Sequence, residues 1–199
     1  MYSEATTKFS EAVGFQPRTF RTGSCSANDS TFPVPEELGF TSCSHSIPGR
    51  NMANLKSKWV GAPHYPHFAH AANRLLPGTM DLVEVPITTD PDSMLWSGTH
   101  AQDFRVELFD AKNHRFMIEK MLRRERARAE PVRAIVTLTH NIFDYTDPSD
   151  FRHQTMKQMI RDFAELADRH GVNLIPSTLG EIADAHRASS GTGSREGSE

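Results

Sequence analysis

The chain has 199 residues, a formal net charge of −3 at pH 7, a hydrophobic content of 37% and a charged content of 24%. This length suffices for one domain with a sizeable core, and the composition is that of a somewhat polar globular protein. A sequence pI of about 6.4 gives no indication of a nucleic acid or an anionic membrane as partner.

Targeting signals and a disulfide framework are not expected. No apolar segment approaches the ~18 residues that a membrane-spanning helix needs. The first residues, MYSEATTKFSEAVGF, lack the apolar core and the small-residue cleavage site of a signal peptide. Two cysteines, Cys25 and Cys43, are too few for a disulfide framework. The default expectation is therefore a cytoplasmic, reducing location.

Helical periodicity begins almost at the first residue. Ala5, Phe9, Ala12 and Val13 share one stripe, and Gly14 is a C-terminal stop. Most domains open with a few irregular residues. This start is therefore typical of a chain that begins inside a fold.

The next part of the chain predicts a strand, a loop, a helix and a second strand. Residues 17–21 are extended, the run TGSCSAND forms a turn, a helix over residues 31–38 ends at Gly39, and residues 40–44 form a strand. This order is typical of the βαβ unit of a parallel sheet. Residues 51–78 contain GAPHYPHFAHAANRLLPG and predict an ordered loop, which at this length is usually functional or an insertion.

Strands and helices continue to alternate to the C-terminus, so the predicted fold class is α/β. The predicted strands are residues 80–88, 132–138 and 172–175, with a turn at TDPDSMLW, and the predicted helices are 113–129, 151–170 and about 177–188. The β-branched run at 134–138 predicts a strand buried on both faces. A methionine and aromatic stripe in helix 151–170 predicts core. The Gly/Ser-rich tail, residues 189–199, predicts disorder.

Polar residues that could support chemistry follow three predicted strands, where ligands and catalysis collect in α/β proteins. They are Arg21 with its TGSCSAND loop; Asp90, Asp92 and Trp96; and His140 with Asn141, followed by Phe143 and Tyr145. An arginine at a strand end can orient a carboxylate, and the aromatic rings can stack on a cyclic substrate. The plainer alternatives are a surface ion pair, an ordinary turn, and a satisfied polar residue that ends a strand.

Three histidines in HYPHFAH form a separate candidate. Neutral imidazoles at the spacing of His64, His67 and His70 can hold zinc. Pro63 and Pro66 exclude a regular helix there, and no Cys, Asp or Glu lies close by in sequence. A metal site built from these residues alone is therefore the lesser alternative.

Three motifs together resemble the polysaccharide deacetylase (NodB-homology) family, specifically the C-terminal part of its domain. They are PRTFRTGSCSAND with the following LGF at 17–40, THN at 139–141, and STLGEIAD at 177–184. The resemblance spans about residues 2–187. It implies a deformed (β/α) barrel and a metal-dependent hydrolase of amide C–N bonds, typically N-acetyl groups on sugars, with zinc the usual metal.

The resemblance also implies roles for individual residues. His140 would be the general acid that protonates the leaving amine, Arg21 would orient a catalytic aspartate, and Trp96 would correspond to an aromatic wall near the acetyl group. The expected partner is a carbohydrate or another amide-bearing small substrate, with no nucleic acid and no membrane.

The departures from the family pattern concern the metal. The family's Asp-Asp and His-x-x-x-His motifs precede the arginine motif, whereas no residue before Arg21 is an aspartate or a histidine. Thr22-Gly23-Ser24 replaces the motif proline, and Asn141 stands where the family has an aspartate. We therefore expect residues 1–188 to be the C-terminal portion of a barrel that is incomplete at its N-terminus, without the metal ligands and with little activity alone.

Two further expectations follow. The chain could instead be a non-catalytic carbohydrate-binding remnant that uses Phe143, Tyr145 and Trp96 as stacking platforms. Missing strands would also leave open sheet edges, which predicts self-association or a partner that supplies those strands.

Overall fold

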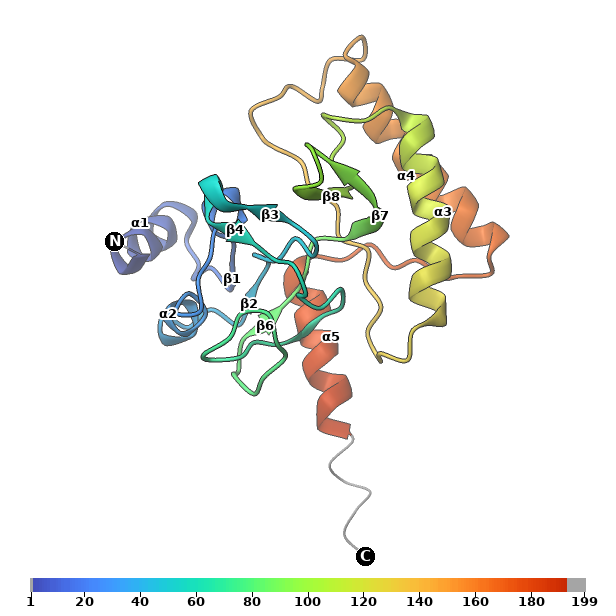
Figure 1. Cartoon of the computed structure of the whole chain (residues 1–199). Helices are drawn as coiled ribbons and strands as arrows, with labels where there is room; N and C mark the ends of the chain where they lie inside the picture. Colours follow the sequence, from blue (N-terminus) through green and yellow to red (C-terminus); the bar gives the residue numbers. More distant parts are fainter. Residues whose placement is uncertain (1, 193–199) are drawn as a thin grey trace, which may run out of the picture.

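The computed structural model describes residues 2–192, except for the side chains of residues 2 and 192, and it is mixed α/β (Figure 1). The helices of this part are α1 (Tyr2–Val13), α2 (Pro33–Glu37), α3 (Ala111–Ala127), α4 (Phe151–Arg169) and α5 (Leu179–Thr192), with short 3-10 turns η1 (Gly23–Cys25) and η2 (Ala53–Leu55). The strands are β1 (Thr19–Phe20), β2 (Ser42–Cys43), β3 (Asn51–Met52), β4 (Ser57–Lys58), β5 (His67–Phe68), β6 (Val83–Glu84), β7 (Thr89–Leu95) and β8 (His100–Asp103).

The principal sheet has the strand order β1-β2-β6-β5. β1, β2 and β6 run parallel, and β5 is antiparallel to β6. The predicted βαβ unit is thus confirmed, because α2 connects the parallel strands β1 and β2. The hairpins β3–β4 and β7–β8 form two further small sheets. Within residues 2–192 these three sheets do not close on themselves, and the deformed barrel stays a prediction.

The described part of the molecule contains two hydrophobic cores. The first lies around the principal sheet and includes Phe32, Cys43, Trp59, Leu82, Ile87 and Ala183. The second lies between the β7–β8 region and the helices α3 and α4, and includes Phe104, Met117, Ile118, Met121 and Leu166. Figure 1 shows the two groups of elements side by side, with α5 next to β2 and β6 of the principal sheet. The apolar stripe of α4 is core at Met159 and Leu166, but Ile160 is 61% exposed.

The predicted loop at residues 51–78 contains the short elements β3, η2, β4 and β5, and three further predictions of secondary structure are wrong. Residues 134–138 form no regular strand. They make one parallel bridge between Leu138 and Arg105, and they exchange hydrogen bonds with Thr88 through Val136. Val136 is buried in the first core and Ile135 packs partly against the second, but Thr137 is exposed, so the second face is covered only in part. The segment lies between the two cores, where neither sheet extends far enough to pair with all of it.

The other two differences have local causes. TDPDSMLW, predicted as a turn, contains the whole of β7, because a register shift between Asp90 and Met94 accommodates the proline. Lys120 of α3 pairs with both aspartates of this run, at 2.5 Å and 2.7 Å. Residues 172–175 form no strand: within residues 2–192 no strand pairs with them, and residues 173–175 are exposed.

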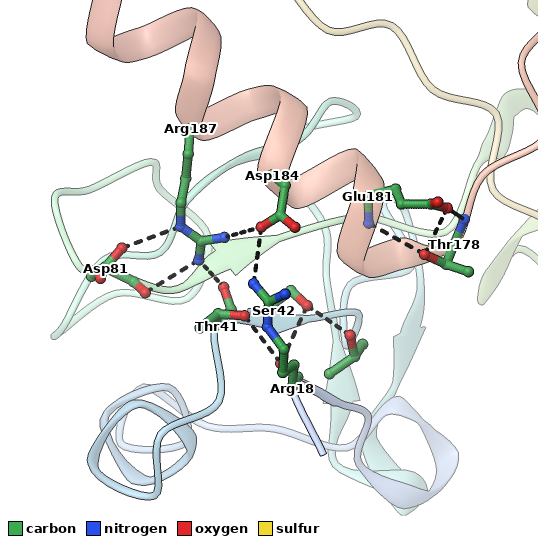
Figure 2. A network of polar contacts seen from close by, with 9 residues as sticks. Arg18, Thr41, Ser42, Asp81, Thr178, Glu181, Asp184 and Arg187 are labelled. Carbon is green, nitrogen blue, oxygen red and sulfur yellow. Dashed lines mark hydrogen bonds and ion pairs between the residues drawn. The ribbon is translucent and has the colours of Figure 1, made fainter. Parts of the chain in front are cut away.

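Helix α5 is fixed to the principal sheet by polar contacts (Figure 2). Its start is a capping box, in which Glu181 Oε2 accepts from Thr178 N–H at 2.6 Å and Thr178 Oγ1 accepts from Glu181 N–H at 3.3 Å. Arg187 donates to the Thr41 carbonyl and to Asp81, so the helix axis is held against the β2–β6 side. The predicted helix start is confirmed.

The end of α5 differs from the prediction. The helix continues to Thr192, so residues 189–192 are helical instead of disordered. The rest of the predicted tail, residues 193–199, lies outside the described residues. None of the helices within residues 2–192 combines the length and apolarity needed to span a membrane.

Candidate functional site

Arg21 lies just past the carboxyl end of β1, the position that the sequence suggested. Its Nε donates to the Ser44 carbonyl at 2.8 Å, and its Nη2 donates to Ser44 Oγ at 2.7 Å. These two bonds anchor the guanidinium across the end of the neighbouring strand β2. Within the described residues no carboxylate contacts Arg21, so its remaining donors are available to an acidic group.

His140 is held by a carboxylate that sequence reasoning did not identify. Its Nδ1 shares a short hydrogen bond with Glu107 Oε1, and Thr139 Oγ1 lies 3.4 Å from Glu107 Oε2. The Glu107 side chain is 6% exposed and the His140 side chain 48% exposed. A buried carboxylate thus orients a solvent-facing imidazole. The alternation of apolar Phe104 and Val106 with polar neighbours was the available signal for Glu107.

Trp96 belongs to a polar cluster at the β7–β8 hairpin. The backbone at Trp96 and Ser97 has φ of 48° and 57°, which is strained for residues with a side chain. The Trp96 ring is 45% exposed, stacks on His100 with 4.7 Å between centroids, and has the Arg105 guanidinium 5.9 Å from its centre. One edge of an aromatic platform therefore remains open to solvent.

Asp103 holds this cluster together. Its buried carboxylate lies 3.2 Å from His100 Nε2 and 2.7 Å from Arg105 Nη2. Burial raises the pKa of Asp103, but the hydrogen bonds and charges of His100 and Arg105 outweigh it and lower the pKa below its usual value. The Asp103 carboxylate is therefore charged, and its contacts with His100 and Arg105 already compensate that charge.

The aromatic rings after His140 are less available than Trp96 for stacking on a ligand. The Arg152 guanidinium lies 4.2 Å from the centre of the Phe143 ring, and Tyr145 packs edge-on at 6.5 Å. Asn141 is exposed. In the described part of the chain, no hydrogen bond or ion pair joins Arg21 to His140, and no ring contact joins Trp96 to Phe143. The structure places Arg21 after β1 and Trp96 after β7, in separate sheets, and His140 after a single bridge at Leu138, so it does not gather the predicted residues into one pocket.

The zinc that the resemblance implies was tested against the buried cluster of Cys43, His45 and Glu84. Within residues 2–192 this is the one group of three such side chains whose ligand atoms all lie within 4.8 Å of one another. Glu84 Oε1 accepts from the backbone N–H groups of His45 and Ser46 at 2.9 Å and 2.7 Å, and Cys43 Sγ donates to Glu84 Oε2 at 2.9 Å.

This cluster does not fit a metal. Thr22 N–H donates to His45 Nδ1 at 3.1 Å, so the neutral ring carries its proton on Nε2 and has no lone pair left for a cation. Burial raises the pKa of the Cys43 thiol well above its ordinary value, and zinc binds the thiolate. Hydrogen bonds already occupy the Glu84 carboxylate. The cluster is a buried hydrogen-bonded unit that fixes the chain after β2.

The histidines of the HYPHFAH segment give no support to the alternative metal site. His64, His67 and His70 are not part of any converging group within the described range. His67 Nδ1 bonds to the Tyr65 carbonyl at 2.8 Å, and His70 Nδ1 accepts from Ala72 N–H at 3.0 Å. Burial lowers the pKa of both His64 and His67 to about 4, so these rings are neutral at pH 7.

Comparisons with models of protein families, with curated proteins and with solved structures find no match to this chain. Function is therefore inferred from the side chains and from the motif resemblance.

Proposed function

We propose that this chain carries the acid part of the catalytic site of a polysaccharide-deacetylase-type hydrolase, acting on amide C–N bonds and first of all on N-acetyl groups of carbohydrates. The observation that carries the proposal is the pair formed by His140 and Glu107. A carboxylate bonded to one nitrogen of an exposed imidazole leaves the other nitrogen to exchange a proton with a substrate.

In this proposal each residue has one task. Amide hydrolysis needs a proton on the departing amine, and His140 Nε2 donates it while Glu107 holds Nδ1–H. Arg21, anchored on Ser44, presents its free donors to an acidic group. In the family that the motifs resemble, a divalent metal polarises the carbonyl and activates water. The residues described here do not fit zinc, and no step is assigned to it.

Activity measurements on N-acetylglucosamine oligomers with added zinc or cobalt test the metal part of the proposal. We expect release of acetate at the background rate, because the acid is present without fitting metal ligands. Turnover that disappears in His140→Ala would contradict this expectation, since the chain would then complete a site alone.

The His140–Glu107 pair is tested by ¹⁵N NMR of the imidazole at a pH where it is neutral. We expect the proton on Nδ1 in the natural chain and a shift of the population toward Nε2–H in Glu107→Ala. Glu119→Ala on α3 is the matched control and leaves the His140 spectrum unchanged. An identical tautomer in Glu107→Ala and the natural chain would remove the observation on which the proposal rests.

A second candidate function is carbohydrate binding without hydrolysis, favoured by the exposed Trp96 ring in its strained backbone conformation. Calorimetric titration with the same oligomers distinguishes it. Binding that is lost in Trp96→Ala and kept in Phe143→Ala, where Arg152 already covers one ring face, supports this function. Absence of binding in the natural chain contradicts it.

A further inference from the structure

Arg50 is a buried cation without a bonded anion. The residue is 5% exposed. Its Nε contacts Met52 Sδ at 3.1 Å and its Nη1 donates to the Ser24 carbonyl at 3.3 Å, and within residues 2–192 no carboxylate contacts it. Nη2 has no hydrogen-bond partner among the described residues, yet it is not among the fully buried unpartnered atoms, so it keeps some contact with solvent. Such a charge is costly unless a counter-ion satisfies it.

The backbone around Arg50 is held rigidly. Trp59 N–H donates to the Arg50 carbonyl at 2.7 Å, and Asn51 N–H donates to the Thr99 carbonyl at 2.7 Å, so the β3–β4 hairpin lies against the tip of β7–β8. On the other side the Cys25 carbonyl accepts from Ser57 Oγ at 2.9 Å and from the Trp59 indole at 2.8 Å. Ser24 and Cys25 are kept in a left-handed conformation, with φ of 54° and 53°.

The positive charges of two more guanidinium groups, those of Arg21 and Arg105, act on the surroundings of Arg50 and Cys25. The charges of Arg21, Arg50 and Arg105 all oppose the effect of burial, which raises the pKa of the Cys25 thiol. Burial lowers the pKa of Arg50, and the charge of Arg105 lowers it further, while Asp103 acts in the opposite sense. Arg50 and Arg105 therefore lie close enough to repel each other, and Arg21 acts with them on Cys25.

The negative charges nearby do not balance the three guanidinium groups. Asp103 is bonded to Arg105 and to His100. Glu84 acts on Arg21 only at a distance, because its oxygens are bonded to Cys43 and to backbone amides, and burial raises its pKa, which disfavours its charged form. The unbalanced positive charge is located on Arg50 and Arg21, neither of which contacts a carboxylate in the described part of the molecule.

We propose that Arg50, with Arg21 and Arg105 around it, binds one small anionic group, a carboxylate or a phosphate carried by a ligand. The free Nη2 of Arg50 supplies the direct hydrogen bond, and the rigid turn at Ser24 and Cys25 fixes the guanidinium plane. This site shares Arg21 with the hydrolase proposal, but it uses neither His140 nor Glu107 and its test requires no turnover, so the two proposals can fail separately.

Thermal unfolding of the whole chain tests the site, with inorganic phosphate and acetate as probes and sodium chloride at equal ionic strength as reference. We expect a saturable rise of Tm in one or both probe anions over chloride, about 5–10 °C at a concentration a hundredfold above Kd. A rise in phosphate alone assigns a phosphorylated ligand. A rise in acetate assigns a carboxylate ligand.

Two variants and a control decide whether Arg50 is responsible. In Arg50→Met the anion-specific rise is lost, while Tm in chloride does not fall, because an uncompensated buried charge is removed. Arg50→Lys keeps the charge without the planar fork, and its half-saturating concentration rises about tenfold. Arg123→Met, at an arginine whose side chain is 69% exposed, leaves the response unchanged.

The proposal is overturned by several outcomes. These are no rise over chloride in the natural chain, a rise that survives in Arg50→Met, or an unchanged half-saturating concentration in Arg50→Lys. If Arg50→Met fails to fold, Arg50→Lys alone decides. A loss of Tm in chloride for Arg50→Met would instead identify the contact with the Ser24 carbonyl as its role.

Discussion

Replacing Glu84 by alanine should destabilise the protein strongly, because this carboxylate is the acceptor, among the described residues, for the buried backbone amides of His45 and Ser46. Glu84 is fully buried, and its two oxygens accept from the backbone amides of His45 and Ser46 and from the Cys43 thiol. Alanine leaves both amides buried without an acceptor, at about 1–3 kcal/mol each. Relief from burying a carboxylate offsets part of that loss, so we expect a net decrease of about 3 kcal/mol in the free energy of unfolding.

Glu84→Gln is the matched control. Glutamine has nearly the same volume and keeps one carbonyl oxygen for the amides of His45 and Ser46, while its NH₂ group faces the Cys43 sulfur. We expect a decrease below about 1.5 kcal/mol. The chain should remain folded in both variants, since domains of this kind have about 5–15 kcal/mol of stability.

Urea unfolding followed by circular dichroism at pH 7 measures both variants, with the slope m checked for two-state behaviour. A value for Glu84→Ala within about 1 kcal/mol of the natural chain would refute the reasoning. Equal losses in the alanine and glutamine variants would also refute it, because the retained carbonyl oxygen would then have no effect.

Three more predictions follow from the same region and from α5. Burial is the main cause that lowers the pKa of His45 from 6.5 to about 3. Between pH 3 and pH 6.5 the unfolded chain therefore binds more protons than the folded chain. Stability should therefore fall as the pH decreases, by up to about 1.4 kcal/mol per pH unit, and urea midpoints of His45→Gln should show a smaller fall. Thr178→Ala removes the capping box with Glu181 and should cost about 1 kcal/mol in urea unfolding, whereas Thr178→Ser should cost far less. Cys25 and Cys43 are buried and burial raises the pKa of both thiols, so a thiol reagent at pH 8 should modify them only after unfolding; fast labelling of the native chain would contradict their burial.

Local patterns in the sequence were enough to predict the long helices and the first parallel strands. Helix α4 was predicted almost to the residue from the helical spacing of its apolar residues and the stop at Gly171, and the structure adds Asp150 as the N-cap. The start of α5 at Thr178 and the parallel pairing of β1 with β2 follow from equally local signals. Arg21 was correctly placed after a strand by the same kind of reasoning, whereas the strand predicted before His140 is a single bridge at Leu138.

Only the tertiary structure decided which side chains meet. The partner of His140 is Glu107, which lies 33 residues before it, and the bonds of Glu84 join it to residues 38–41 positions earlier. No periodicity along the chain encodes such distances. The buried charge of Arg50 was equally invisible in the sequence, because an arginine after Pro-Gly is ordinarily at the surface, and only packing between two hairpins covers it. Secondary structure here reflects interactions between near neighbours in sequence, whereas the candidate sites depend on contacts that exist only after the two cores have packed.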